Sequence, residues 1–219
     1  MNKVKVIFFV FVLVSVVDII GIIFKLPSLI VIFKPFILPL LVALYAVSVT
    51  KRNIWYVMAL IFSFLGDVFL LFEGSLFFIG GLVFFLAAHF LFIRIVISWL
   101  QKSSFQHKIL AFIPFIITFS VLIYVLKDTL NELLIPVIIY GITISLFGAI
   151  SLLNYLNSRS VKSLWMFLGS VVFIASDSIL AIDKFSFSIP LFKVLIMVTY
   201  VSAQYLIYRS MVLESENNK

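Results

Sequence analysis

Short polar breaks divide the chain into eight long apolar stretches. A membrane-spanning helix needs about 20 apolar residues to cross a hydrocarbon core of about 30 Å, and each stretch comes close to that length or exceeds it. We expect spans near residues 4–24, 29–50, 54–72, 76–99, 109–126, 133–156, 163–182 and 191–213. The stretches are continuously apolar, with no alternation of period two, so helices must satisfy the backbone hydrogen bonds. The pattern predicts an all-α, polytopic bundle of about eight transmembrane helices, with one membrane domain over 1–213 and a polar cytoplasmic tail over 214–219.

Composition agrees with a membrane protein. Of the 219 residues, 64% are hydrophobic and 11% are charged, which is too little polar material to coat a water-soluble domain. Cysteine is absent, which excludes disulfides, thiolate metal sites and a cysteine nucleophile. The first apolar run extends to Phe24 without a small-residue cleavage site, so we interpret it as a retained span and not as a signal peptide.

Basic residues set the expected orientation. When the loops are assigned alternately to the two sides, one side carries Lys3, Lys5, Lys51, Arg52, Lys102, Lys108, Arg159, Lys162, Arg209 and Lys219. The other side carries only Lys25, Lys127 and Lys184. This bias predicts that both termini are cytoplasmic. The membrane that we expect is the inner (cytoplasmic) membrane of a bacterium. Because the basic residues are scattered between apolar runs, nothing indicates a nucleic-acid partner.

Two aspartates interrupt the apolar runs. Asp67 and Asp177 lie in similar phrases, 110 residues apart, and an ionised carboxylate in hydrocarbon costs at least ~2.5 kcal/mol. Counted from the expected span ends, both lie roughly 8–9 Å below the external interface, as does Lys34, with Asp18 at a similar level. The repeated phrase also suggests two parallel four-helix repeats.

These aspartates have two possible roles. They could be packing devices that bond to neighbouring helices through Ser63, Ser176 or Lys34. Alternatively they form an acid/base pair, because burial and a second nearby carboxylate would keep one of them protonated near neutrality. Lys34 and Asp67 lie on adjacent spans and could pair, which makes Asp177 the favoured acid.

Further polar residues complete the candidate site. We expect spans two, three, seven and eight to bring Lys34, Asp67, Asp177 and Gln204 around one outward-open cavity, with His89 on its floor. Tyr200 and Gln204 are four apart and should point the same way. His89 could equally be a hydrogen-bonded core histidine. No metal site is expected, because a catalytic zinc usually takes three well-placed protein ligands and the chain has only two histidines.

Several motifs together carry a family resemblance. They are Lys34-Pro35, Phe62-Ser63-x-x-Gly66-Asp67 with Leu70-Leu71, Gly81-x-x-Phe84-x-x-x-x-His89, Ser176-Asp177-Ser178-x-Leu180-Ala181 with Phe185, and Tyr200-x-x-x-Gln204. In this order they resemble the YhhN-like lysoplasmalogenase family of eight-span membrane proteins, over spans two to eight. The resemblance implies a hydrolase that cleaves the vinyl ether bond of lysoplasmalogens, releasing a fatty aldehyde and glycerophosphocholine or glycerophosphoethanolamine. Its partners would be the lysophospholipid substrate and bilayer lipids.

The chemistry of that reaction fits the residues. Protonation of the β-carbon of a vinyl ether gives an oxocarbenium ion, which water captures as a hemiacetal that collapses to the aldehyde. One carboxylic acid could protonate the carbon while a second carboxylate stabilises the cation or activates water, as in glycosidases. Asp67 and Asp177 are the predicted catalytic pair, and no cofactor is expected. The predicted supporting or substrate-binding residues are Lys34, Ser63, His89, Ser176, Tyr200 and Gln204.

Two alternatives stay open. The first is hydrolysis of an ester or amide in another lysolipid. The second is a small proton-coupled transporter that relays protons through the same aspartates. Transporters usually have helices broken at the midplane, whereas we expect the prolines here near helix ends or outside them: Pro27, Pro35, Pro39, Pro114, Pro136 and Pro190.

Overall fold

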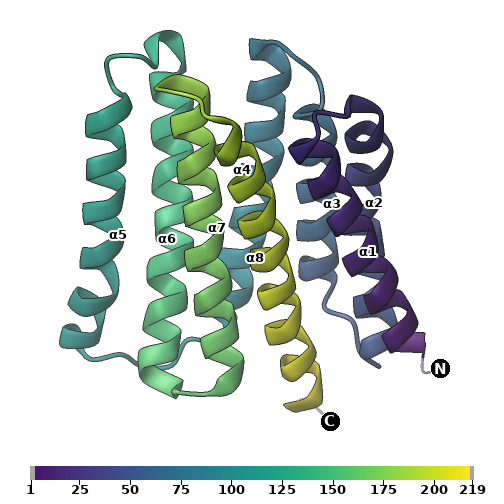
Figure 1. Cartoon of the computed structure of the whole chain (residues 1–219). Coiled ribbons are helices and arrows are strands. Elements are labelled where there is room, and N and C mark those ends of the chain that lie inside the picture. The colour runs from purple at the N-terminus through teal and green to yellow at the C-terminus, as the bar shows by residue number, and fades with distance from the viewer. Residues whose placement is uncertain (1–2, 218–219) are drawn as a thin grey trace. The chain divides into compact units, whose positions relative to one another are not determined.

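The computed structural model describes residues 3–217, and within that range it consists of helices without strands (Figure 1). The helices are α1 (Lys3–Ile23), α2 (Pro27–Ser48), α3 (Ile54–Phe69), α4 (Ser75–Trp99), α5 (Phe105–Leu126), the 3-10 turn η1 (Asn131–Leu133), α6 (Leu134–Ser158), α7 (Val161–Phe185) and α8 (Pro190–Asn217). All except α3 and η1 are long and apolar enough to cross a membrane. The predicted all-α fold of an integral membrane protein is confirmed.

Helix α3 is shorter than the span predicted over 54–72. It has 16 residues, about 24 Å of helix, and ends at Phe69. Leu70 and Leu71 then form tight turns, their amides donating to the carbonyls of Gly66 and Val68. Apolar residues therefore continue past the end of the helix, and hydropathy alone does not mark that end. Within the described residues the bundle of about eight helices is therefore confirmed, with seven long apolar helices and the shorter apolar helix α3.

Two other helices run further than expected. Helix α7 reaches Phe185, where the apolar run was expected to end at residue 182, and α8 continues to Asn217. Most of the expected polar tail is therefore helical, while residues 218–219 lie outside the described range. Lysine and glutamate are good helix formers, so a helix can extend through polar residues that no longer suit the membrane.

The prolines also differ from expectation. Pro35 and Pro39 lie inside α2, and Pro114 lies inside α5. Each removes one backbone donor, yet both helices continue through these positions. The prediction that every proline lies near a helix end or outside a helix was wrong for these three, but neither α2 nor α5 is broken into half-helices.

Polar residues in the short breaks start the next helices. Asn53, Ser104 and Ser160 precede α3, α5 and α7, and their side-chain oxygens accept hydrogen bonds from amides of the first turn. Such caps satisfy donors that have no partner within the helix. The breaks that the hydropathy pattern located are therefore also the places where three helices begin.

The described chain divides into two compact units, residues 3–88 with 211–217 and residues 89–210. The boundaries fall within α4 and α8. The single membrane domain and the two parallel repeats stay predictions. Asp67 and Lys34 belong to the first unit, and Asp177, His89 and Gln204 belong to the second.

In the first unit, glycines allow close helix contacts. A Cβ on Gly21 of α1 would lie 3.0 Å from the Cβ of Leu29 on α2. A Cβ on Gly66 of α3 would lie 2.7 Å from the ring of Phe85 on α4. Since ordinary contacts are longer, a larger residue at either position would require the neighbouring side chain to shift, and such close approaches at glycine are common between membrane helices.

In the second unit, α5, α6 and α7 lie side by side (Figure 1). His107 Nδ1, at the start of α5, lies 3.0 Å from Asn157 Oδ1 at the end of α6. Ser210 Oγ on α8 donates to the carbonyl of Lys162 at the start of α7, at 2.8 Å. The breaks after α4 and α6 therefore lie at one end of this unit, as the alternating loop assignment requires.

Candidate functional site

Asp177 accepts a hydrogen bond from a tyrosine that the sequence did not single out. Tyr140 lies near the start of α6, and its hydroxyl donates to Oδ2 of Asp177 on α7. Tyr140 is 8% exposed, whereas Asp177 is half-buried. A tyrosine in an apolar run gives no signal in a hydropathy pattern, although a buried phenol usually needs a polar partner. That requirement was the one clue that could have directed attention to Tyr140.

His89 lies in an aromatic surrounding. Its ring is fully buried, and its centroid is 4.7 Å from that of Phe173 and 5.5 Å from that of Tyr140. Phe147 and Phe92 follow at 5.8 and 6.2 Å. All four rings meet the imidazole edge to face, a favourable arrangement for aromatic pairs. The structure thus places His89 beside the tyrosine that bonds Asp177.

Tyr200 and Gln204 of α8 point the same way, as their spacing predicts. Gln204 Nε2 donates to the Tyr200 hydroxyl at 3.4 Å, and the Tyr200 ring meets Phe173 at 5.5 Å. Gln204 is fully buried, and within the described residues its Oε1 has no hydrogen-bond partner. Through Phe173, this pair adjoins the rings around His89.

Ser176, next to Asp177, has a structural contact. Its Oγ donates to the backbone carbonyl of Ile196 on α8 at 3.0 Å. A hydroxyl that bonds a backbone carbonyl on a neighbouring membrane helix stabilises the pair of helices. This contact gives Ser176 a packing role and holds α7 against α8 beside Asp177.

In the first unit, Asp67 and Ser63 are both buried on α3. Asp67 is 4% exposed and Ser63 is fully buried, with no hydrogen-bond partner for its Oγ in the described part of the chain. They are four residues apart and therefore share one face of the helix. Asp67 lies in the last turn of α3, which ends two residues later.

Lys34 acts electrostatically on Asp18, a residue outside the predicted site. Asp18 on α1 is fully buried, and neither carboxylate oxygen has a hydrogen-bond partner among residues 3–217. The half-buried Lys34 on α2 interacts electrostatically with that carboxyl. A counter-charge offsets part of the large penalty for burying a carboxylate. Sequence reasoning noted Asp18 at the level of Lys34 but gave it no role.

Three of these residues lie at different distances from the ends of their helices, and their common depth below the interface stays a prediction. At about 1.5 Å per residue, Asp67 lies about 3 Å from the end of α3, Lys34 about 10 Å from the start of α2 and Asp177 about 12 Å from the end of α7. The expected value of 8–9 Å was counted from the ends of apolar runs, and α3 and α7 do not end there. The gathering of Lys34, Asp67, Asp177 and Gln204 around one cavity stays a prediction.

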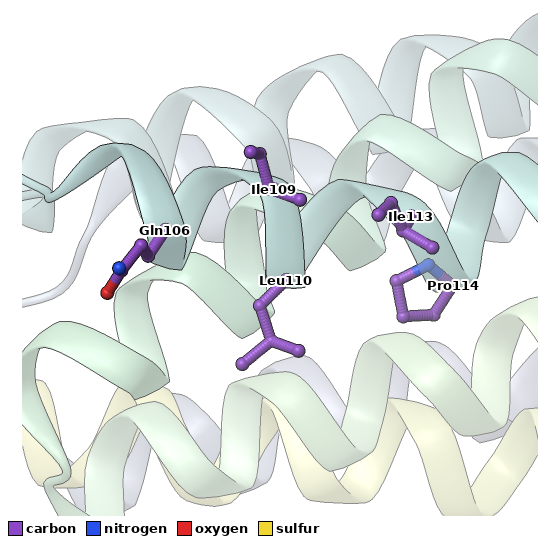
Figure 2. A pocket seen from close by; sticks show the side chains of 5 residues that line it. All are labelled: Gln106, Ile109, Leu110, Ile113 and Pro114. Carbon is purple, nitrogen blue, oxygen red and sulfur yellow. The ribbon is translucent and has the colours of Figure 1, made fainter.

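A shallow groove lies elsewhere in the second unit. It has a volume of about 410 Å³ and is lined by Gln106, Ile109, Leu110, Ile113 and Pro114 of α5 (Figure 2). It occupies the start of α5, which adjoins the end of α6, whereas the Tyr140–Asp177 bond is near the start of α6. None of its lining side chains titrates, so the groove offers no acid or base. Among residues 3–217, no group of three side chains could hold a metal ion.

The comparisons with known proteins agree with one another. The sequence profile of the YhhN family matches residues 29–211. Lysoplasmalogenase TMEM86A of Bos taurus is 28% identical to the chain over 165 residues, and lysoplasmalogenase TMEM86A of Homo sapiens is 27% identical over 165 residues. Each alignment covers 70% of this chain, which spans 63% of the length of each relative. No solved structure matches the chain. Because the profile covers most of its length, the chain belongs to the YhhN family.

Proposed function

We propose that the protein is a membrane-embedded hydrolase that cleaves the vinyl ether bond of a lysoplasmalogen. The products are a fatty aldehyde and glycerophosphocholine or glycerophosphoethanolamine. The observation that carries this proposal is the carboxyl of Asp177 within a membrane helix, held by the hydroxyl of Tyr140. Membership of the YhhN family and two relatives named lysoplasmalogenase support it.

The proposed reaction is acid-catalysed hydration followed by collapse of a hemiacetal. An acid transfers its proton to the β-carbon of the vinyl ether, and the electron pair of the double bond forms the new C–H bond. The resulting oxocarbenium ion is captured by water, whose proton passes to a carboxylate. The two groups proposed for these steps are Asp67 and Asp177, because each is a carboxyl on an apolar helix and can serve as a positioned acid or base.

The test is mass spectrometry of lipids incubated with the purified protein. We expect a lysoplasmalogen to be cleaved while its saturated ether analogue stays intact, because a saturated ether has no carbon that accepts a proton. In heavy water, one deuterium should appear on the aldehyde carbon next to the carbonyl. An intact lysoplasmalogen would contradict the proposal, and cleavage of an ester or amide lysolipid instead would identify a different lysolipid hydrolase.

For orientation, we propose a cytoplasmic membrane with both termini in the cytoplasm, as the distribution of basic residues indicates. The natural chain lacks cysteine, so single cysteines report without background. Ser75→Cys and Gln101→Cys both replace exposed residues at opposite ends of α4. We expect an impermeant maleimide to label Ser75→Cys in intact cells and Gln101→Cys only after the cells are broken. The reverse pattern would mean that the orientation is inverted.

A further inference from the structure

The hydroxyl of Tyr140 bonds Asp177 from a position that the surrounding rings fix. Tyr140 is almost fully buried in α6, and its ring stands at 87° to that of His89, with centroids 5.5 Å apart. The His89 ring in turn contacts Phe173, one turn before Asp177 on α7. A buried ring packed in this way has little freedom to turn its hydroxyl elsewhere, because interiors are close-packed. The bond to Asp177 is therefore a fixed feature of the second unit.

The direction of this bond bears on the charge of Asp177. A phenol has one proton to donate, and an ionised carboxylate only accepts, so the two groups match. Hydrogen bonds to ionised acceptors are also the stronger ones, and a bond that favours the charged form holds a carboxyl in that form. Sequence reasoning favoured Asp177 as the protonated acid because Lys34 could pair with Asp67, whereas the bond from Tyr140 points to the opposite assignment.

We propose that Tyr140 is a positioning residue that holds Asp177 as the carboxylate, so that Asp177 takes the proton of the attacking water and a different group protonates the vinyl ether carbon. This inference rests on the proposed hydrolase function. We assign the acid role to Asp67, the second carboxyl of the proposed catalytic pair. The proposal reverses the roles of Asp67 and Asp177 expected from the sequence. It also adds Tyr140, which the sequence did not indicate, to the candidate site.

The proton balance of the reaction closes with these roles. The acid gives its proton to the β-carbon, and the oxocarbenium ion forms. Water then bonds to the cationic carbon while one of its protons passes to the carboxylate of Asp177. When the carbon–oxygen bond to glycerol breaks, Asp177 returns that proton to the departing oxygen. The proton of the hemiacetal hydroxyl restores the acid, and no other reactant is needed.

Tyr140→Phe tests the proposal because it removes the hydroxyl and keeps the ring. At neutral pH, we expect the infrared spectrum of this variant to gain the C=O stretching band of a protonated carboxylic acid. The band should be absent from Tyr140→Phe/Asp177→Asn.

We also expect kcat to fall about 10-fold or more with KM little changed, the loss expected for a hydrogen bond to a charged group. Tyr45→Phe is the matched control, since Tyr45 is a buried tyrosine whose hydroxyl accepts from the Asn53 amide instead.

Two results would overturn the role of Tyr140. One is an unchanged infrared spectrum and an unchanged kcat in Tyr140→Phe. The other needs no folded Tyr140 variant: a carboxylic acid band in the wild-type protein that Asp177→Asn removes would show that Asp177 is already protonated. The infrared comparison does not depend on activity. If the wild-type protein hydrolyses no lysoplasmalogen, the proposed function fails while the protonation state of Asp177 is still decided.

Discussion

Asp177→Asn and Asp67→Asn are each expected to lower the rate of lysoplasmalogen hydrolysis at least ~10²-fold, the usual contribution of a positioned acid or base. Asparagine keeps the size of the side chain, and its carbonyl oxygen can still accept the hydrogen bond from Tyr140. It carries neither a charge nor an exchangeable acid proton, so each substitution separates chemistry from packing. The measurement is the rate of aldehyde release by purified protein in detergent.

Asp183→Asn is the matched control for this experiment. Asp183 lies on α7, six residues after Asp177, and its Oδ1 accepts a bond from Ser188 Oγ at 2.7 Å near the end of that helix. The same chemical change on the same helix should therefore leave hydrolysis intact. Full activity in both Asp177→Asn and Asp67→Asn, with folded protein, would return these carboxyls to a purely structural role.

Gly169→Val is expected to destabilise the protein by about 1–3 kcal/mol or more, the range for overpacking a filled interior. A Cβ at Gly169 of α7 would lie 2.7 Å from Cγ1 of Ile207 on α8. It would also lie 3.1 Å from the Ile207 amide nitrogen and 3.2 Å from the Ala203 carbonyl oxygen, and backbone atoms cannot rotate away. The expected result is a lower midpoint of thermal unfolding in detergent.

Ala175→Val provides the comparison for this change in stability. Ala175 is an exposed residue on the same helix, so the added methyl groups meet no neighbouring backbone there. We expect an unfolding midpoint close to that of the wild type. A Gly169→Val protein as stable as Ala175→Val would mean that α7 and α8 do not depend on this close approach. Since Ser176 and Phe173 hold the Asp177 region against α8, the destabilised variant should also lose activity.

The sequence by itself determined the fold class and most helix positions. Continuously apolar runs of this length favour membrane-spanning helices, because a helix satisfies its own backbone hydrogen bonds within the hydrocarbon. Polar residues in the breaks, such as Asn53 and Ser160, cap the helix that follows. Intramembrane carboxyls stand out for the same reason, because a charge in hydrocarbon is costly wherever the chain folds. The hydropathy pattern therefore marks Asp67, Asp177 and His89 as candidate site residues. The catalytic role of the two aspartates and the supporting role of His89 stay predictions.

Only the tertiary structure decided which side chains meet across helices. Tyr140 is 37 residues from Asp177, and no local pattern links an apolar helix position in α6 to a carboxyl in α7. The contact of Ser176 with the Ile196 carbonyl is equally invisible, because helix register depends on packing and not on hydropathy. The early end of α3 at Phe69 belongs to the same group: the residues that follow it are still apolar, so hydropathy continued the span where the backbone turned. Hydropathy reflects how favourable it is to place a residue in the membrane. Hydrogen-bond partners and helix ends depend instead on which atoms of other helices and of the following turn lie nearby.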